Sequence, residues 1–164
     1  MDNNNIEKLK KISRNYILAR KKFRKIADLT PELAGNDNLI GRIGEFIALQ
    51  FLRETCNRTN VVRNKNIVEA GYDILADNKK VSVKIITSEN IRGFTTHVRN
   101  PWDELVLIEL DGSEISRIGL LEKEALLRQN QKPNPIVKRT MLSDEGIIMK
   151  YGKVYSGNEV KRYL

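Results

Sequence analysis

Residues 71–84 carry three polar side chains whose spacing places them on one face of a β-hairpin: Asp73, Ser82 and Lys84. A carboxylate can hold a divalent cation, which lowers the pKa of a bound water and neutralises the charge that grows on a phosphodiester under attack. A lysine beside that cation adds a second positive charge at the same place. This trio therefore has the chemistry for metal-assisted phosphodiester hydrolysis. The plainer alternative is a solvated ion pair between Asp73 and Lys84, which contributes at most about 1 kcal/mol.

The hairpin must hold one register for this chemistry. Apolar and polar residues alternate through 81–85, as in a half-buried strand, so Ser82 lies on the polar side together with the lysine. With Asp77 and Asn78 as a two-residue turn, Asp73 lies opposite Ser82, at roughly 5 Å between Cβ atoms. A three-residue loop or a bulge would break this pairing.

A second carboxylate, Glu45, lies in the middle of a helix predicted over residues 36–54. Apolar residues recur there at the spacing of a buried helix, at Leu39, Ile40, Ile43, Phe46, Ile47 and Phe51. Gly41 lies one turn before Glu45 and Gly44 lies beside it, and each glycine costs the helix up to about 1 kcal/mol relative to alanine. These glycines indicate either close packing of the helix on a sheet or room for a metal ion or phosphate.

Helix and hairpin together resemble the PD-(D/E)XK, or restriction-endonuclease-like, nuclease superfamily. The matching residues are Gly-x-x-Gly-Glu on the helix, Gly-Tyr-Asp at the start of the hairpin and x-Val-Lys on its return strand. The chain most resembles a small branch with this pattern, and more distantly the archaeal Holliday-junction resolvases. The resemblance runs from about Gly41 to Asp111, because residues 103–111 look like the next core strand and 122–129 like a following helix. It implies a mixed sheet flanked by helices and a site that holds Mg²⁺ or Mn²⁺.

The resemblance also implies a role for each site residue. Asp73 corresponds to the metal-bridging carboxylate, Glu45 to an accessory acid on the helix, and Lys84 to the lysine that positions or polarises the attacking water. Ser82 departs from the pattern, because the family has an acidic residue or glutamine there. Mg²⁺ prefers anionic oxygen ligands and keeps several waters, so Asp73 and Glu45 would still hold it, although more weakly.

Charge favours a nucleic-acid partner. The formal net charge is +8 and the pI is about 9.6. The first 30 residues hold nine Lys or Arg against three Asp or Glu, in a helical pattern that ends before Thr30. Such asymmetry is typical of phosphate contact, although the helix could also form a dimer or lie on a membrane surface. We expect DNA as the partner and no membrane, with a homodimer left open. The candidate DNA contacts are Lys21, Lys22, Lys25, Arg92 and Arg99.

Two further regions give less specific indications of structure and function. Segment 92–102 mixes cationic, hydroxyl and aromatic groups, as nucleic-acid contacts do. It also fits an edge strand over 94–98 followed by a turn, with Trp102 on the core. Residues 136–141 and 146–155 predict short strands, or a hairpin through Gly152.

Length and composition indicate one domain: 164 residues, 40% apolar and 30% charged. Its predicted parts are the basic helix 1–30, a nuclease-like core 36–130 and a C-terminal extension 131–164. The lone Cys56 and a polar N-terminus indicate a reducing cytoplasm. His97 is the only histidine, which excludes two-histidine ribonuclease catalysis, the histidine-metal nuclease motif and Cys/His zinc sites. No phosphate-binding glycine loop occurs, which argues against a nucleotide-driven motor.

The sequence therefore predicts an α/β fold with a mixed central sheet flanked by helices. The leading function is that of an Mg²⁺-dependent DNA endonuclease of the restriction or defence type. The alternative is a DNA-binding module that kept the fold and lost its metal site at Ser82. A weaker alternative is a junction resolvase, which would need a symmetric dimer.

Overall fold

The computed structural model describes most of the chain from Leu39 onward. The described residues are 39–64, 71–87, 90, 93–111 and 114–164, with residues 19, 22, 23, 25–27, 29 and 30 before them. The chain divides into two compact units, Met1–Asn36 and Asp37–Leu164.

In the first unit, the described residues as far as Leu29 are helical, and Lys22 and Lys25 are exposed on them. The hydroxyl of Thr30 donates to the carbonyl of Ile26 at 2.8 Å, at the point where the sequence predicts the end of the helix. The remainder of the predicted basic helix, including Lys21, lies outside the described residues.

The second unit contains eight described strands and four α-helices. In chain order they are α2 (Leu39–Glu54), β1 (Val61–Arg63), β2 (Ile74–Ala76), β3 (Lys79–Ile86), β4 (Phe94–His97), β5 (Glu104–Asp111), β6 (Glu114–Glu122), α3 (Lys123–Arg128), β7 (Ile136–Lys138), the 3-10 helix η2 (Arg139–Leu142), α4 (Ile147–Tyr151), β8 (Lys153–Ser156) and α5 (Asn158–Lys161). None of the described helices is long and apolar enough to cross a membrane.

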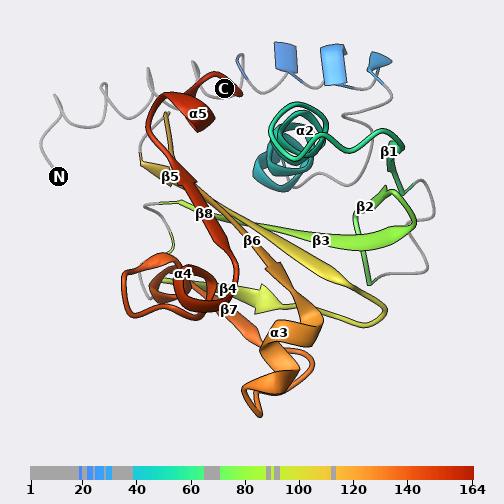
Figure 1. Cartoon of the computed structure of the whole chain (residues 1–164). Helices are drawn as coiled ribbons and strands as arrows, with labels where there is room; N and C mark the ends of the chain where they lie inside the picture. The colour runs from blue at the N-terminus through green and yellow to red at the C-terminus, as the bar shows by residue number, and fades with distance from the viewer. Residues whose placement is uncertain are drawn as a thin grey trace, which may run out of the picture. The chain divides into compact units, whose positions relative to one another are not determined.

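A six-stranded sheet runs through this unit in the order β1-β2-β3-β5-β6-β8 (Figure 1). β3 and β5 pair in parallel, whereas their neighbours pair antiparallel, so the sheet is mixed as predicted. A parallel pair needs a long connection, and residues 87–103 provide it. Within that connection, β4 pairs with β7 to form a separate two-stranded sheet.

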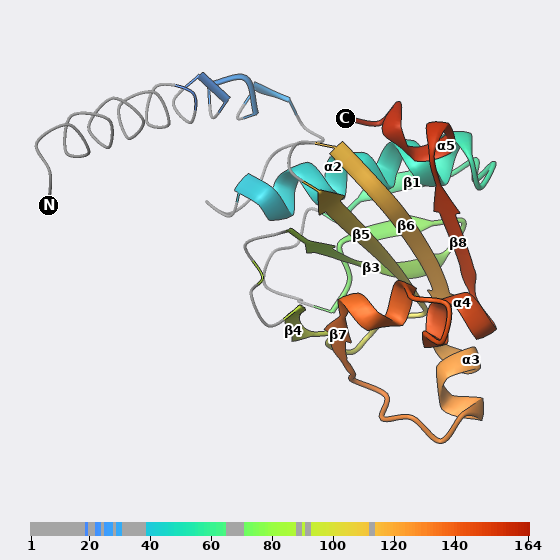
Figure 2. The ribbon, with the colours of Figure 1, turned by 90° about the vertical axis from the view of Figure 1, so that its left-hand side faces the viewer.

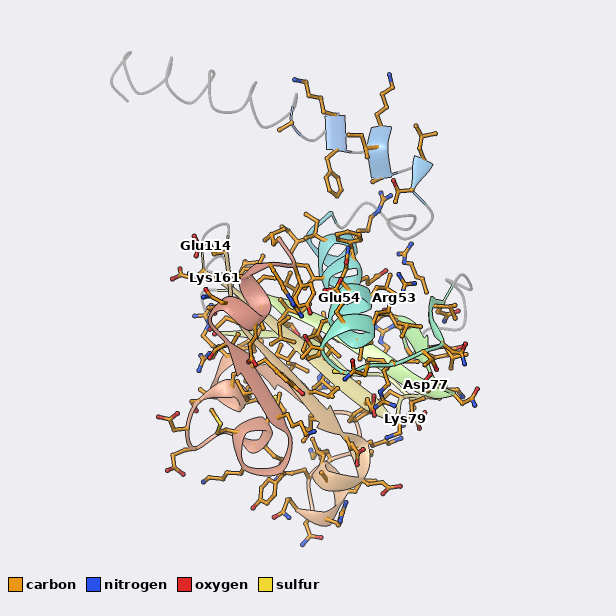
Figure 3. The ribbon with its side chains drawn as sticks, turned by 45° about the horizontal axis from the view of Figure 1, so that its top comes forward. Arg53, Glu54, Asp77, Lys79, Glu114 and Lys161 are labelled. Carbon is orange, nitrogen blue, oxygen red and sulfur yellow. The ribbon has the colours of Figure 1, made fainter. Side chains whose placement is uncertain are left out.

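Elements cover both faces of the main sheet (Figures 1 and 2). α2 and α5 lie on one face, where Ile47, Phe51 and Val160 belong to one apolar core. α3, α4 and the two-stranded sheet lie on the other face, over a second core that contains Trp102. An ion pair of 2.8 Å between Lys161 and Glu114 ties α5 to the start of β6, and Figure 3 shows both residues.

The predicted hairpin forms in the predicted register. Ile74 pairs with Val81, so Asp73 is opposite Ser82. Asp77 and Asn78 form the turn with φ of 48° and 69°, the left-handed conformation that two-residue hairpin turns of type I′ require. The predicted helix before the hairpin and the strand and helix after it are confirmed as α2, β5 and α3.

The structure corrects the prediction for the C-terminal region. Residues 147–151 form helix α4, where the sequence predicts a strand, and β8 alone follows Gly152 and pairs with β6. A short apolar run does not distinguish a strand from a helix. Here the packing against β6 favours the helix. A Cβ built on Gly119 of β6 would lie 2.9 Å from Cγ2 of Ile148, so the missing side chain gives α4 its place. β1 and β6 are strands that the sequence analysis did not predict.

Trp102 belongs to the core, as one of its two interpretations predicts. It is 1% exposed, and its indole Nε1 donates to the carbonyl of Pro133 at 3.0 Å. The edge-strand interpretation of residues 94–98 is also confirmed, as β4, although its partner is β7 and the main sheet is not involved.

Candidate active site

A polar pocket of about 530 Å³ lies where β3 continues beyond the end of its partner β2. The side chains of Glu45, Asp73 and Lys84 line it, from α2, from the residue before β2 and from β3. β2 pairs with β3 only as far as Val81, so the following part of β3 has an open edge. Three of the four residues that the sequence analysis singles out for chemistry thus line one pocket at this edge, and the fourth, Ser82, does not line it.

Asp73 makes two hydrogen bonds to β3 at the point where its pairing with β2 ends. Its backbone N–H donates to the carbonyl of Val81 at 2.9 Å, and its Oδ2 accepts from the N–H of Val83 at 2.6 Å. These bonds hold the carboxylate against the edge of β3. Burial raises the pKa of Asp73 even though the Val83 N–H and the charge of Lys84 lower it. Both bonds from described side chains or backbone to this carboxylate go to Oδ2.

Glu45 reaches the same pocket from the helix and is held by an arginine. The Nε of Arg63 donates to Oε2 of Glu45 at 2.6 Å, and Nη2 contacts the same oxygen. Burial raises the pKa of Glu45 to about 7, the charge of Arg63 opposes that rise, and the nearby charge of Asp73 adds to it. Glu45 and Asp73 thus line the same pocket, and the charge of Asp73 acts on Glu45.

Lys84 completes the group from the return strand. Burial lowers the pKa of its ammonium, the charge of Asp73 opposes that change, and the charge of Arg99 adds to it. Its Nζ donates to the hydroxyl of Thr96 at 3.3 Å, which connects β3 to β4. Several titratable groups with shifted pKa values in one pocket are characteristic of functional sites.

Ser82 lies beside the group and supports it. The side chain is 3% exposed, and its Oγ donates to Oδ2 of Asp73 at 3.5 Å, a long hydrogen bond. The hydroxyl is therefore directed at the carboxylate and is not among the groups that line the pocket. Within the described part of the chain, no cluster of three or more His, Cys, Asp or Glu side chains has the arrangement of a metal site.

The two helical glycines have different roles. A Cβ on Gly44 would lie 3.3 Å from Cβ of Ile85, so this glycine allows α2 to approach β3 closely. Gly41 lines the pocket beside Glu45. Close packing is thus confirmed for Gly44, and room for a metal ion or phosphate stays a prediction for Gly41.

The candidate DNA contacts are only partly described. Arg99 is exposed, and its charge acts on Lys84, which places it near the pocket. Arg92 lies outside the described residues, as does Lys21.

Two groups of site residues were missed by the sequence analysis. Arg63 was missed because it belongs to the short strand β1, which carries no clear alternation. Asn90 and Thr96 also line the pocket. They come from the connection between β3 and β5, and no sequence pattern places that connection over the hairpin.

The fold and the pocket define an α/β protein with a mixed sheet and a polar site at the open edge of a central strand. Neither a comparison with protein-family models nor a search of curated proteins found a match for the sequence.

The raised pKa of Glu45 predicts a pH-dependent effect of Glu45→Gln on stability. Between the ordinary value of 4.5 and about 7, the folded protein binds more protons at this residue than the unfolded chain does. The stability of the wild type therefore falls as the pH rises through this window, and glutamine removes that loss. We expect the melting temperature of the variant to rise relative to wild type across the window and then level off. A difference that stays flat would show that Glu45 titrates normally.

Proposed function

We propose that the protein is an Mg²⁺-dependent nuclease that hydrolyses DNA phosphodiesters, with a restriction-endonuclease-like core. One observation supports this most: the carboxylates of Glu45 and Asp73 and the ammonium of Lys84 line a single pocket at the open edge of β3. Helix, hairpin and following parallel strand occur in the order that the resemblance implies.

The residues present fit a magnesium ion held by two carboxylates. Mg²⁺ usually binds through one or two carboxylates and substrate phosphate, and it keeps several waters. In both Asp73 and Glu45, the bonds from described residues go to one carboxylate oxygen, Oδ2 and Oε2 respectively. The other oxygen of each would hold the ion. When bound, the ion would supply charge neutralisation and a water of lowered pKa.

The protein's own groups have distinct tasks in this proposal. Asp73 is fixed by the edge of β3, so it provides a rigid ligand. Lys84 brings a positive charge to the phosphate and orients the attacking water, and Thr96 holds its ammonium in place. Arg63 keeps Glu45 turned toward the pocket and shields its charge from that of Asp73.

The second candidate function is DNA binding without catalysis. Two observations favour it: Ser82 supplies no charge, and Glu45 already has a cationic partner in Arg63. The positive charge of Arg63 would lie beside the ion and repel it, which weakens binding. The two functions differ in whether divalent ions bind at all, because both share contacts to DNA.

Ser82→Asp should separate them. A third carboxylate beside Asp73 adds anionic charge to the site, so we expect Mn²⁺ binding to tighten on the order of tenfold, as more ligand charge does in other ion sites. Isothermal titration calorimetry measures this. Ser82→Asn is the matched control, since asparagine has the same shape as aspartate without its negative charge. If neither wild type nor Ser82→Asp binds a divalent ion while both stay folded, the result contradicts the nuclease function and favours the binding module.

Lys22→Gln with Lys25→Gln tests the partner. Both lysines are exposed on helical residues. If they neutralise phosphates, the slope of log affinity against log salt should become shallower by roughly 0.9 for each phosphate of duplex DNA that the variant no longer neutralises. Fluorescence anisotropy over a salt series gives this slope. An unchanged slope with unchanged affinity would exclude both residues from the interface.

A further inference from the structure

The two-stranded sheet beside the pocket exposes an aromatic and basic face. β4 and β7 pair Phe94 with Lys138 and His97 with Ile136, with an irregularity between the two pairs. These four side chains, named here the β4–β7 face, are all exposed, with Phe94 at 41% and Ile136 at 39%. The face therefore combines an exposed aromatic ring with the ammonium of its cross-strand partner Lys138.

This face adjoins the candidate active site. Thr95 and Thr96, which follow Phe94 directly in the chain, line the pocket. Asn90, another lining residue, donates from Nδ2 to the carbonyl of Phe94 at 3.3 Å. A strand of nucleic acid with one phosphate at Lys84 would therefore have a neighbouring base within reach of Phe94.

The two segments that contain β4 and β7 carry net positive charge, which attracts phosphate. Residues 90–102 and 125–143 contain no aspartate or glutamate. Their basic residues are Arg92, Arg99, Arg128, Lys132, Lys138 and Arg139, of which Arg139 is paired with Glu109 on β5. Positive charge is therefore concentrated in these two segments as well as in the N-terminal helix, and such a concentration attracts an anionic polymer.

The face is also rigid, because its inner side is anchored in the core. Val137, between the two exposed residues of β7, is 0% exposed, and so is Val98 directly after β4. The N–H of Val98 donates to the carbonyl of Pro135 at 3.1 Å, and that of Arg139 donates to the carbonyl of Gly93 at 2.7 Å. A fixed aromatic ring loses little conformational freedom when a base stacks on it.

We propose that the β4–β7 face binds an unpaired segment of DNA, with one base stacked on Phe94 and the adjoining phosphate directed into the pocket. Proteins recognise single strands by this combination of an aromatic platform and a basic track, because a base must be unstacked to lie on a ring. This inference rests on the proposed function, and it narrows the substrate from duplex DNA to splayed or single-stranded DNA.

The test is binding of three labelled DNAs, measured by fluorescence anisotropy in EDTA so that no cleavage occurs: a single strand, a forked duplex with unpaired arms, and a fully paired duplex. Wild type should bind the first two more tightly than the third. Phe94→Ala should weaken binding of the single strand by about 5- to 150-fold, the range for removing one base–aromatic stack. Phe94→Tyr keeps a ring and should bind as wild type does.

Val62→Ala is the matched control, because Val62 is also exposed, at 56%, and lies on β1. It should leave all three affinities unchanged. Equal single-strand affinity for Phe94→Ala and wild type would overturn the inference, as would a dimer that Phe94→Ala dissociates without affecting DNA binding. Because these measurements need no catalysis, a protein that binds splayed DNA through Phe94 but never cleaves it would refute the nuclease function and leave this inference standing.

Discussion

Replacing Asp73 by asparagine is expected to lower the rate of Mg²⁺-dependent DNA cleavage by a factor on the order of 10² or more. Asparagine has the same shape as aspartate, and its side-chain oxygen can still accept from the N–H of Val83. The side chain therefore stays bound to the edge of β3. What it removes is the negative charge that would hold the ion. The measurement is the initial rate of cleavage of a labelled forked DNA at saturating Mg²⁺.

Asp77→Asn is the control for this substitution. Asp77 is in the turn of the same hairpin, where its Oδ1 accepts from the N–H groups of Thr59 and Asn60, and Figure 3 shows it beside Lys79 at the end of the hairpin. It does not line the pocket. The same chemical change there should leave cleavage unchanged. Equal rates for Asp73→Asn and Asp77→Asn would remove Asp73 from the reaction.

Phe51→Ala should destabilise the protein by about 3–5 kcal/mol, the usual cost of emptying a buried aromatic site. Phe51 is 0% exposed and joins α2 to the C-terminal elements through edge contacts with two rings. Its centroid is 5.0 Å from that of Tyr155 and 6.4 Å from that of Tyr163. Domains are commonly stable by only about 5–15 kcal/mol, so this destabilisation is large, and urea unfolding followed by circular dichroism measures it.

Phe94→Ala provides the comparison for stability. Because the ring of Phe94 is exposed, its removal should change the free energy of unfolding by no more than about 0.5 kcal/mol. A similar destabilisation for both phenylalanines would mean that the two faces of the molecule are not packed as described. A small change would also establish that Phe94→Ala is folded for DNA-binding measurements.

The hairpin and α2 could be predicted from the sequence because local patterns specify them. Asp77 and Asn78 suit a tight turn, and alternation fixes which side chains share a face. α4 could not be predicted, because its position depends on the space that Gly119 leaves on a distant strand. A window of neighbouring residues carries no information about such a contact.

The residues of the candidate site likewise include some that local pairing brings together and others that only tertiary packing brings together. Asp73 and Ser82 come together through hairpin pairing, which is local. The proximity of Glu45 depends on how α2 packs on the sheet, and only the resemblance indicated it. The partnership of Glu45 with Arg63, and the wall formed by Thr96, follow from tertiary packing of segments far apart in sequence. These contacts determine which atoms of the pocket would bind an ion or a phosphate.

Anomalous diffraction from a crystal of the wild-type protein soaked in Mn²⁺ tests the central claim most directly. The claim predicts a single strong peak between Oδ1 of Asp73 and Oε1 of Glu45, with Arg63 still on Oε2 of Glu45. A crystal of Asp73→Asn soaked in the same way should lose that peak. The absence of any peak in the wild type would contradict a metal-dependent site and leave DNA binding without catalysis as the candidate function.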